Sequence, residues 1–500
     1  MRCFGCLCCY NNITNWNEYQ FLAEESVALR TLFDKLWDGH EVRDDGDGAS
    51  LVAIDRVFLH ERTGGVALKS LLASNRAPVD PSRVYSVMDH IVSFAPDRAR
   101  DDARSPGGEV FITQTREMAT KAGVNIIDTD DPRQGIIHVV APELGLVLPG
   151  MSIVCPDSHT CSLGALGALA VGVGTGDVEH AMATGVLRLK KPAQMRIVVE
   201  GELKPGVTAK DVALHIIAKF GADGGRLRAI EFAGSTIRNF DIEARLTLCN
   251  MAVEFAAFTA LIAPDEKTLA YVRSRPNETF AEYWDKCLTD WARLHSDEGA
   301  VFEEEIAIDA ADIEVMATWG TSPEQAAPVS WRIPVRDELH GAQTAKANAA
   351  FSYMGVVDGE DFDTLRINGA FIGSCTNGRL SDLRLAAAVL KGRKVADHVH
   401  AVCVPGSKAV KAAAEAEGLD KIFTEAGFVW GSPGCAMCFY AGGETFAPGA
   451  RIISSTNRNF EGRQGPSVRT HLASPSTVAA SAIAGRIVAA DPAILKVVNS

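Results

Sequence analysis

Short apolar runs alternate with longer amphipathic stretches along most of this chain. The run 196–203 is rich in β-branched residues and predicts a strand. Thr208 then begins a predicted helix, with Asp211 in its first turn, that ends at Gly221. Further along, the same pattern predicts strands at 371–374 and 401–404 and helices at 382–391, 408–417 and 474–485. Such strand–helix alternation predicts an α/β fold with mostly parallel sheets.

The length of 500 residues corresponds to about three domains of ordinary size. The stretch 318–345 contains Pro323, Pro328 and Pro334 and has no clear period, so we expect it to be an irregular linker. The acidic stretch 356–363 is expected to be a solvated loop. No apolar run reaches the roughly 18–20 residues that a membrane span needs.

The formal net charge of −14 makes nucleic acid and anionic membranes poor partners. An anionic substrate would therefore have to be met by a local group of cations. Arg458 and Arg463 are the candidates for such a group.

Three of the twelve cysteines stand out by their surroundings: Cys375 in Gly-Ser-Cys-Thr-Asn, and Cys435 and Cys438 in Pro-Gly-Cys-Ala-Met-Cys. A [4Fe–4S] cluster normally takes four thiolates, so three leave one iron open to act as a Lewis acid. Taken alone, the C-x-x-C pair is also compatible with a thioredoxin-type redox pair or half of a zinc site. No second C-x-x-C or H-x-x-H lies downstream of it.

Residues 1–25 form a cysteine-rich extension that we expect to be unstructured. Its cysteines are too close together for an ordinary zinc finger, and metal binding or palmitoylation are the alternatives: Cys3, Cys6, Cys8 and Cys9. The extension lacks the apolar core of a secretory signal, so we expect a reducing, cytoplasmic environment. The glycine-rich run 172–176 lacks the third glycine of a dinucleotide site and predicts a tight backbone passage instead.

Several longer motifs resemble the aconitase superfamily and, more closely, the large subunits of 3-isopropylmalate dehydratase. They follow the family order from about residue 26 to the C-terminus: Thr-Leu-Phe-Asp-Lys-Leu-Trp at 31–37, Met-Asp-His at 88–90, Pro-Asp-Ser-His-Thr at 156–160, Cys-Asn-Met-Ala-Val-Glu at 249–254, Ile-Gly-Ser-Cys-Thr-Asn at 372–377, Pro-Gly-Cys-Ala-Met-Cys at 433–438, Ser-Thr-Asn-Arg-Asn-Phe-Glu-Gly-Arg at 455–463 and Arg-Thr-His-Leu-Ala-Ser-Pro at 469–475.

The resemblance implies an aconitase-like core of three α/β/α domains, at 26–205, 206–335 and 336–500, without the swivelling fourth domain. It also implies one [4Fe–4S] cluster per chain, held by the three cysteines. The expected reaction interconverts 2- and 3-isopropylmalate by dehydration and rehydration, a step of leucine biosynthesis. Because the serine base of the family lies on the swivelling domain, we expect a separate small subunit to supply it.

The resemblance implies roles for the residues at positions that match the family motifs. His90, with Asp89 beside it, matches the acid that protonates the leaving hydroxyl. The remaining matches are residues near the open iron (His138, Asp157, His159 and Glu254), a substrate contact (Ser158), substrate-carboxylate arginines (Arg458 and Arg463) and asparagines that hydrogen-bond the cluster or its cysteines (Asn250 and Asn457). Viewed singly, His138 would more often be a core residue, Asp157-Ser158 a helix cap and the arginines surface ion pairs.

Two positions depart from the family pattern. Phe258 stands where an arginine is usual, and Gly65 or Val66 stands where a glutamine is usual. If they line the pocket, they favour a bulkier or more apolar diacid. A paralogous dehydratase acting on homocitrate, citramalate or another hydroxy diacid is therefore the alternative function. An iron-responsive, nucleic-acid-binding role is a minor alternative, which the negative charge disfavours.

Overall fold

The computed structural model describes residues 29–276, 284–339 and 342–496, and the cysteine-rich extension 1–25 lies outside these residues. Within them the strands form five sheets. Two sheets have five parallel strands each, one has four parallel strands, and two small sheets are antiparallel. The expected α/β fold with mostly parallel sheets is confirmed.

The first five-stranded sheet has the order β5-β4-β3-β6-β7. Its strands are β3 (Arg56–His60), β4 (Val84–Val87), β5 (Asn125–Ile127), β6 (Ser152–Cys155) and β7 (Leu169–Gly172). Its helices are α2 (Gly64–Ala73), α3 (Gly108–Ala122), α4 (Ile137–Glu143) and α5 (Thr175–Thr184), the last of which follows β7. Buried apolar residues of β3, α2 and α5 form one core beneath this sheet, among them Leu59, Leu68 and Val178.

The second five-stranded sheet has the order β17-β16-β15-β18-β19. Its strands are β15 (Gly369–Ile372), β16 (His400–Cys403), β17 (Phe428–Trp430), β18 (Arg451–Ser454) and β19 (Arg469–Leu472). Its helices are α12 (Leu380–Leu390), α13 (Lys408–Ala416), α14 (Leu419–Ala426) and α15 (Pro475–Ala484). Both large sheets place their first strand in the centre, the next two on one side and the last two on the other. Ligands in such sheets bind beyond the carboxyl ends of the strands, where the order reverses.

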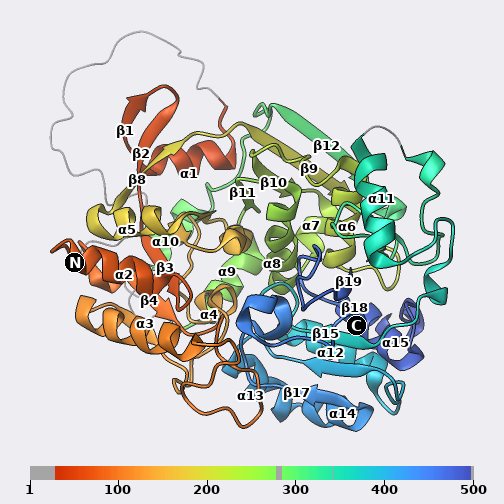
Figure 1. Cartoon of the computed structure of the whole chain (residues 1–500). Coiled ribbons are helices and arrows are strands. Elements are labelled where there is room, and N and C mark those ends of the chain that lie inside the picture. Colours follow the sequence, from red (N-terminus) through yellow and green to blue (C-terminus); the bar gives the residue numbers. More distant parts are fainter. Residues whose placement is uncertain (1–28, 277–283, 340–341, 497–500) are drawn as a thin grey trace, which may run out of the picture.

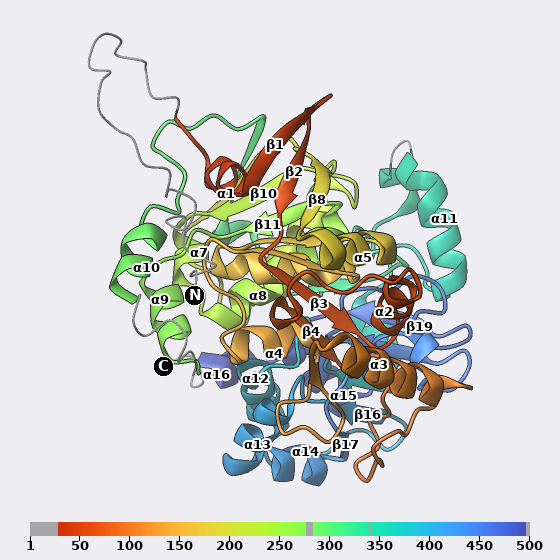
Figure 2. The ribbon, with the colours of Figure 1, turned by 90° about the vertical axis from the view of Figure 1, so that its left-hand side faces the viewer.

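The four-stranded sheet has the order β11-β10-β9-β12, with β9 (Gln194–Glu200), β10 (Ala229–Ala233), β11 (Thr259–Leu261) and β12 (Glu304–Asp309). Its helices are α6 (Ala209–Phe220), α7 (Ser235–Asn239) and α8 (Ile242–Met251). α8 runs near the middle of the molecule, between the two large sheets (Figures 1 and 2). β9 lies before the predicted domain boundary at 205, but it pairs with β10 and β12, which lie after that boundary.

The predicted elements are found within a few residues of their expected bounds. Thr208 and Asp211 form the capping box of α6, which is why that helix begins where the sequence predicts. The prediction that 318–345 is an irregular linker is wrong in part. It contains β14 (Ala326–Pro328), which pairs with β13 (Met316–Thr318), and the start of α11 (Ala342–Met354). Pro328 is tolerated because a two-stranded sheet consists of edge strands.

The remaining elements cover the outside: α1 (Leu32–His40), β1 (Glu41–Gly46), β2 (Ala49–Ala53), β8 (Val186–Lys190), α9 (Glu266–Arg273), α10 (Trp284–Trp291) and α16 (Pro492–Lys496). The four-stranded sheet and part of the first five-stranded sheet share the largest buried core, while the second five-stranded sheet has a core of its own. Among the described residues, none of the helices combines the length and apolarity needed to cross a membrane.

Candidate active site

A cavity of about 220 Å³ lies where the carboxyl ends of the two large sheets meet. Residues of the first sheet that end or follow β3, β4 and β6 line the cavity, including His60, His90 and Asp157. From the second it receives the residues that follow β15, β17 and β18, including Cys375, Cys435 and Arg458. The same strand-end position in both sheets thus brings distant segments of the chain to one pocket.

The three candidate ligand cysteines line this cavity, are buried and form no disulfide. Cys375 follows β15 through Gly373 and Ser374, and Ser374 has a positive φ of 75°, unusual for a residue with a side chain. A Cβ on Gly373 would lie 2.8 Å from the Val404 carbonyl oxygen, so the passage before Cys375 needs glycine. The Cys435 amide donates to the Asp89 carbonyl at 2.7 Å, which ties the cysteine pair to the first sheet.

Two buried asparagines hold the thiols. Asn250, in the last turn of α8, donates from Nδ2 to Cys375 Sγ at 3.3 Å. Asn457 Nδ2 lies 3.5 Å from the same sulfur, and its Oδ1 accepts from Cys438 Sγ at 3.8 Å. Asn457 Nδ2 also donates to Asn250 Oδ1 at 3.2 Å, so the two amides support each other. The structure therefore places both predicted asparagines against the cysteines.

The thiol environment distinguishes between two interpretations of the C-x-x-C pair. Burial, followed by the neighbouring Cys438, raises the pKa of Cys375 to about 12, and burial also raises the pKa of Cys435 well above its usual value. A thioredoxin-type pair needs a nucleophilic cysteine whose pKa is lowered. These thiols suit a metal, which displaces their protons on binding, better than disulfide exchange.

His90 lies between two carboxylates. Its Nδ1 is 2.6 Å from Asp89 Oδ1 and its Nε2 is 3.1 Å from Asp157 Oδ2. Asp89 is fixed in turn by the Ile137 amide, which donates to Oδ2 at 2.9 Å. Burial by itself would lower the pKa of His90, but the Asp89 charge and the hydrogen bonds to both carboxylates outweigh it and hold that pKa well above its usual value.

The network continues from Asp157 to the second sheet. Asp157 Oδ1 caps the short 3₁₀ helix Ser158–Leu166 by accepting from the His159 amide at 2.7 Å, and Asp157 also lines the cavity. His159 Nε2 lies 3.0 Å from Glu254 Oε1, and Arg458 Nε lies 2.7 Å from the same oxygen. Arg458 Nη2 donates to Ser158 Oγ at 3.0 Å. Arg463 reaches Cys438 Sγ with Nη2 at 3.7 Å.

Comparisons with known proteins show the family of this chain. The model of the aconitase family (aconitate hydratase) matches residues 34–485. The chain belongs to the aconitase family. It is 46% identical to 3-isopropylmalate dehydratase large subunit 1 of Bradyrhizobium diazoefficiens over 459 residues, which cover 92% of this chain and 96% of that protein. A crystal structure of aconitase X from Thermococcus kodakaraensis aligns with 96% of this chain and 100% of its own, at 13% identity and a TM-score of 0.44.

Among the predicted site residues, His138 has the least expected surroundings. It is completely buried in α4, and neither ring nitrogen has a hydrogen-bond partner among the described residues. Burial lowers its pKa to about 4, so the ring is neutral at neutral pH. Buried polar atoms without partners are rare in native proteins, and a bound ligand or water is a common explanation.

Phe258 and Val66 do not line the cavity, so the condition under which they would favour a bulkier or more apolar substrate is not met. Phe258 is partly buried against the largest core, and Val66 is exposed on α2. The expectation of a more apolar substrate loses its structural basis.

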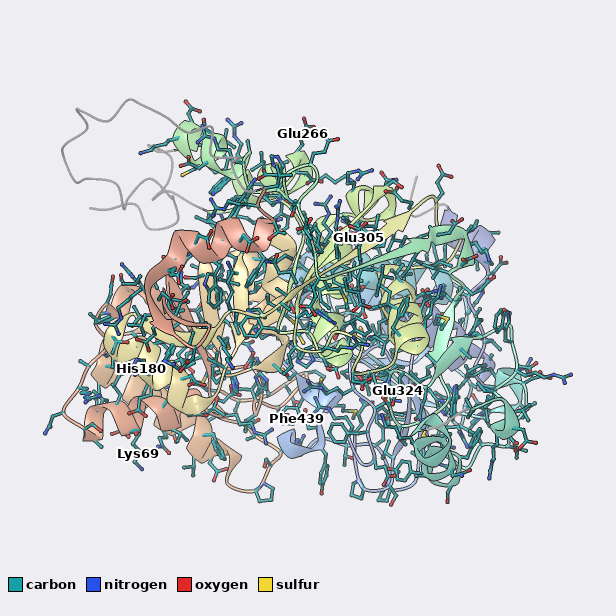
Figure 3. All side chains as sticks on the ribbon, turned by 90° about the horizontal axis from the view of Figure 1, so that it is seen from above. Lys69, His180, Glu266, Glu305, Glu324 and Phe439 are labelled. Carbon is teal, nitrogen blue, oxygen red and sulfur yellow. The ribbon has the colours of Figure 1, made fainter. Side chains whose placement is uncertain are left out.

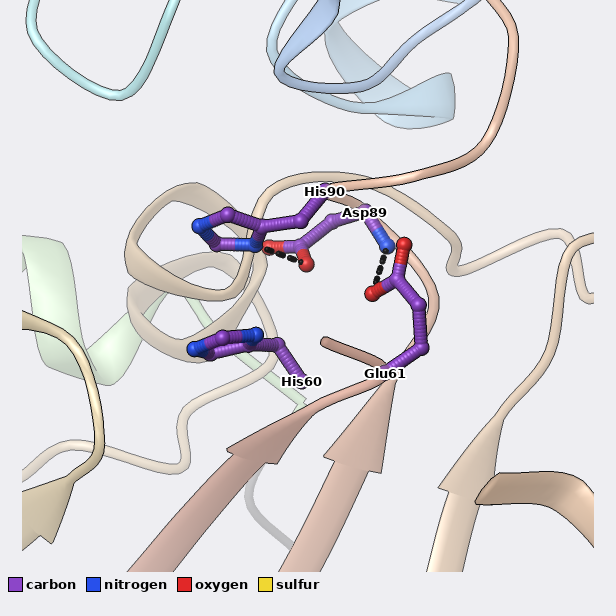
Figure 4. A group of neighbouring side chains, drawn as sticks. All are labelled: His60, Glu61, Asp89 and His90. Carbon is purple, nitrogen blue, oxygen red and sulfur yellow. Dashed lines mark hydrogen bonds and ion pairs between the residues drawn. The ribbon is translucent and has the colours of Figure 1, made fainter. Parts of the chain in front are cut away.

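Among the cavity-lining residues that sequence reasoning missed, three have notable contacts: His60, Arg62 and Phe439. His60 stacks on His90, and Glu61 accepts from the Asp89 amide at 3.0 Å (Figure 4). The position of His60 in the sequence could have indicated a site residue, because His60 ends a buried strand of a parallel sheet. Phe439 directly follows Cys438, and Figure 3 shows it beside the N-terminal part of the ribbon.

Proposed function

We propose that this chain is the large subunit of an iron–sulfur hydro-lyase that interconverts 2-isopropylmalate and 3-isopropylmalate by dehydration and rehydration. The observation that carries the proposal is the meeting of three free buried thiols with one continuous acid–base network around a single cavity. Its membership of the aconitase family and its likeness to a 3-isopropylmalate dehydratase large subunit support the same reaction.

The residues present fit a [4Fe–4S] cluster. Cys375, Cys435 and Cys438 would hold it, with Asn250 and Asn457 as hydrogen-bond donors and acceptors around the sulfurs. When bound, a cluster with three cysteine ligands supplies a Lewis-acidic iron for the hydroxyl and carboxylate of the substrate. The unpartnered ring nitrogens of His138 fit a bound water or ligand, although His138 does not itself line the cavity.

The chain's own residues bind the substrate and handle one of its protons. Both nitrogens of His90 face carboxylates, which only accept, so both carry protons and the ring is an imidazolium. His90 can therefore give a proton to the departing hydroxyl, while Asp157 and Asp89 fix the ring. Ser158, Arg458 and Arg463 form a polar wall for the substrate carboxylates, with Glu254 and His159 orienting Arg458.

The base that removes the carbon-bound proton has no counterpart among these residues. We propose that it comes from a small subunit carrying the swivelling domain, which would also cover the cavity from water. The three cysteines that line the cavity form no disulfide, which suits a reducing compartment, and we propose the cytoplasm.

The proposal is tested by anaerobic purification of the chain with and without its small subunit. The complex should interconvert the two isopropylmalates and form a heterodimer or heterotetramer. The chain alone should bind its cluster but turn over at least 10²-fold more slowly, because a positioned proton-transfer group contributes about 10²–10⁴-fold. Equal activity without the small subunit would place the base within this chain, and a complex inactive on every hydroxy diacid would refute the function.

A further inference from the structure

Arg62 lines the cavity and has no anionic partner among the described residues. It stands two residues after the end of β3 and lines the cavity together with Arg458 and Arg463. Its side chain is exposed, and within the described residues it forms neither a hydrogen bond nor an ion pair. By contrast, Arg458 is committed to Glu254 at 2.7 Å. The cavity therefore holds a cation that nothing in the described residues neutralises.

One aromatic ring positions two of these arginines. The guanidinium carbon of Arg62 lies 5.0 Å from the centre of the Phe439 ring, and that of Arg463 lies 5.4 Å from the same ring. His90 meets Phe439 edge-on with ring centres 5.8 Å apart. Cation–π contact orients a guanidinium without using its N–H donors, which stay available for an anion. Two like charges held near one buried ring favour an anion between or beside them.

We propose that Arg62 is a substrate-binding residue that acts with Arg463, across the ring of Phe439, to hold one carboxylate of the hydroxy diacid. This rests on the proposed function and extends it to a residue outside the family motifs. A chain with a net charge of −14 attracts an anionic substrate only through such a local group of cations. The planar fork of arginine also fixes the orientation of the carboxylate, which a lysine does not.

The test uses the cluster-loaded complex with its small subunit. Arg62→Met keeps most of the aliphatic stem and removes the charge, and Arg62→Lys keeps the charge without the fork. We expect Arg62→Met to raise KM for 2-isopropylmalate about 10–100-fold with kcat changed less than about threefold, since hydrogen bonds to charged groups are lost from binding. The dissociation constant of isopropylsuccinate, which lacks the reacting hydroxyl, should rise in parallel, and Arg62→Lys should fall between.

Arg76→Met is the matched control, because Arg76 is exposed shortly after α2 and does not line the cavity. It should leave KM and the dissociation constant unchanged. An active complex in which Arg62→Met binds both compounds as wild type does would overturn the inference and leave the proposed function intact. The inference would also be overturned if Arg76→Met had an equal effect on binding, or if Arg62→Met lowered kcat and left binding unchanged. A wild-type complex inactive on every hydroxy diacid would instead overturn the proposed function itself.

Discussion

The imidazole rings of His60 and His90 stack with their centres 4.0 Å apart and their planes 24° from parallel. His60 ends β3 and His90 follows β4, so neighbouring parallel strands set this contact. Burial, followed by the nearby charge of His90, lowers the pKa of His60 to about 4. His60 therefore stays neutral, and its ring can support the His90 cation without repelling it.

This contact predicts that His60 positions His90. His60→Ala should lower kcat about 10–100-fold by freeing the His90 ring, because small misplacements of a catalytic group have effects of that size. His60→Phe keeps a flat ring and should recover most of the rate. Steady-state kinetics of the reconstituted complex measure both, and equal loss in the two variants would mean that the imidazole acts chemically.

His90 should be required for the proton transfer itself. His90→Asn removes the acid and should lower kcat about 10²–10⁴-fold while the cluster content stays unchanged. His180→Asn is the control, because His180 is exposed on α5 (Figure 3) and should retain full activity. A His90→Asn enzyme with more than a tenth of the wild-type kcat would exclude His90 as the acid.

The three cavity cysteines should each be needed to hold iron. Serine at Cys375, Cys435 or Cys438 should abolish the visible absorption of the cluster and reduce iron and sulfide in the anaerobically purified chain. Cys403→Ser is matched in burial, because Cys403 is completely buried in β16 but does not line the cavity. It should retain the cluster. Stoichiometric zinc without sulfide in the wild-type chain would contradict the cluster assignment.

Asp382 should make stability depend on pH. It is buried in α12, accepts from Asn377 Nδ2 at 2.9 Å, and burial raises its pKa to about 7. Between about pH 4 and 7 the folded state keeps a proton that the unfolded chain loses, so the free energy of unfolding falls as pH rises. Between pH 5 and 8, Asp382→Asn should gain about 2–3 kcal/mol relative to wild type.

Urea unfolding of both proteins at the two pH values measures this difference. Because other buried carboxyl groups titrate in both proteins, the comparison between variant and wild type isolates Asp382. Parallel pH profiles would mean that Asp382 is ionised without cost in the folded chain.

The sequence was informative wherever function depends on short local motifs. Cys375 and the Cys435–Cys438 pair could be recognised because strand ends in an α/β fold carry their ligands within a few residues. Arg62 could not, since its role depends on contact with Phe439, which lies on the other large sheet. Only the packing of two separate cores brings these two residues together.

The errors have the same origin. Phe258 drew attention because it stands where the family usually has an arginine, but the chain has a left-handed turn at Ala256, with a φ of 59°, and Phe258 packs against the core. Pro328 suggested irregular structure because proline disfavours central strands, yet an edge position accepts it. Side-chain direction and edge position are set by tertiary structure, which local sequence patterns do not contain.

The shared strand order of the two large sheets has a consequence for how such a protein can change. One sheet presents three buried thiols, and the other presents imidazoles and carboxylates, each from loops that its own core supports. Substitutions in the loops after β3 and β4 can alter the imidazole and carboxylate side of the cavity while the thiol loops keep their shape. The site is in this sense modular, and one half can change while the other half keeps its thiols.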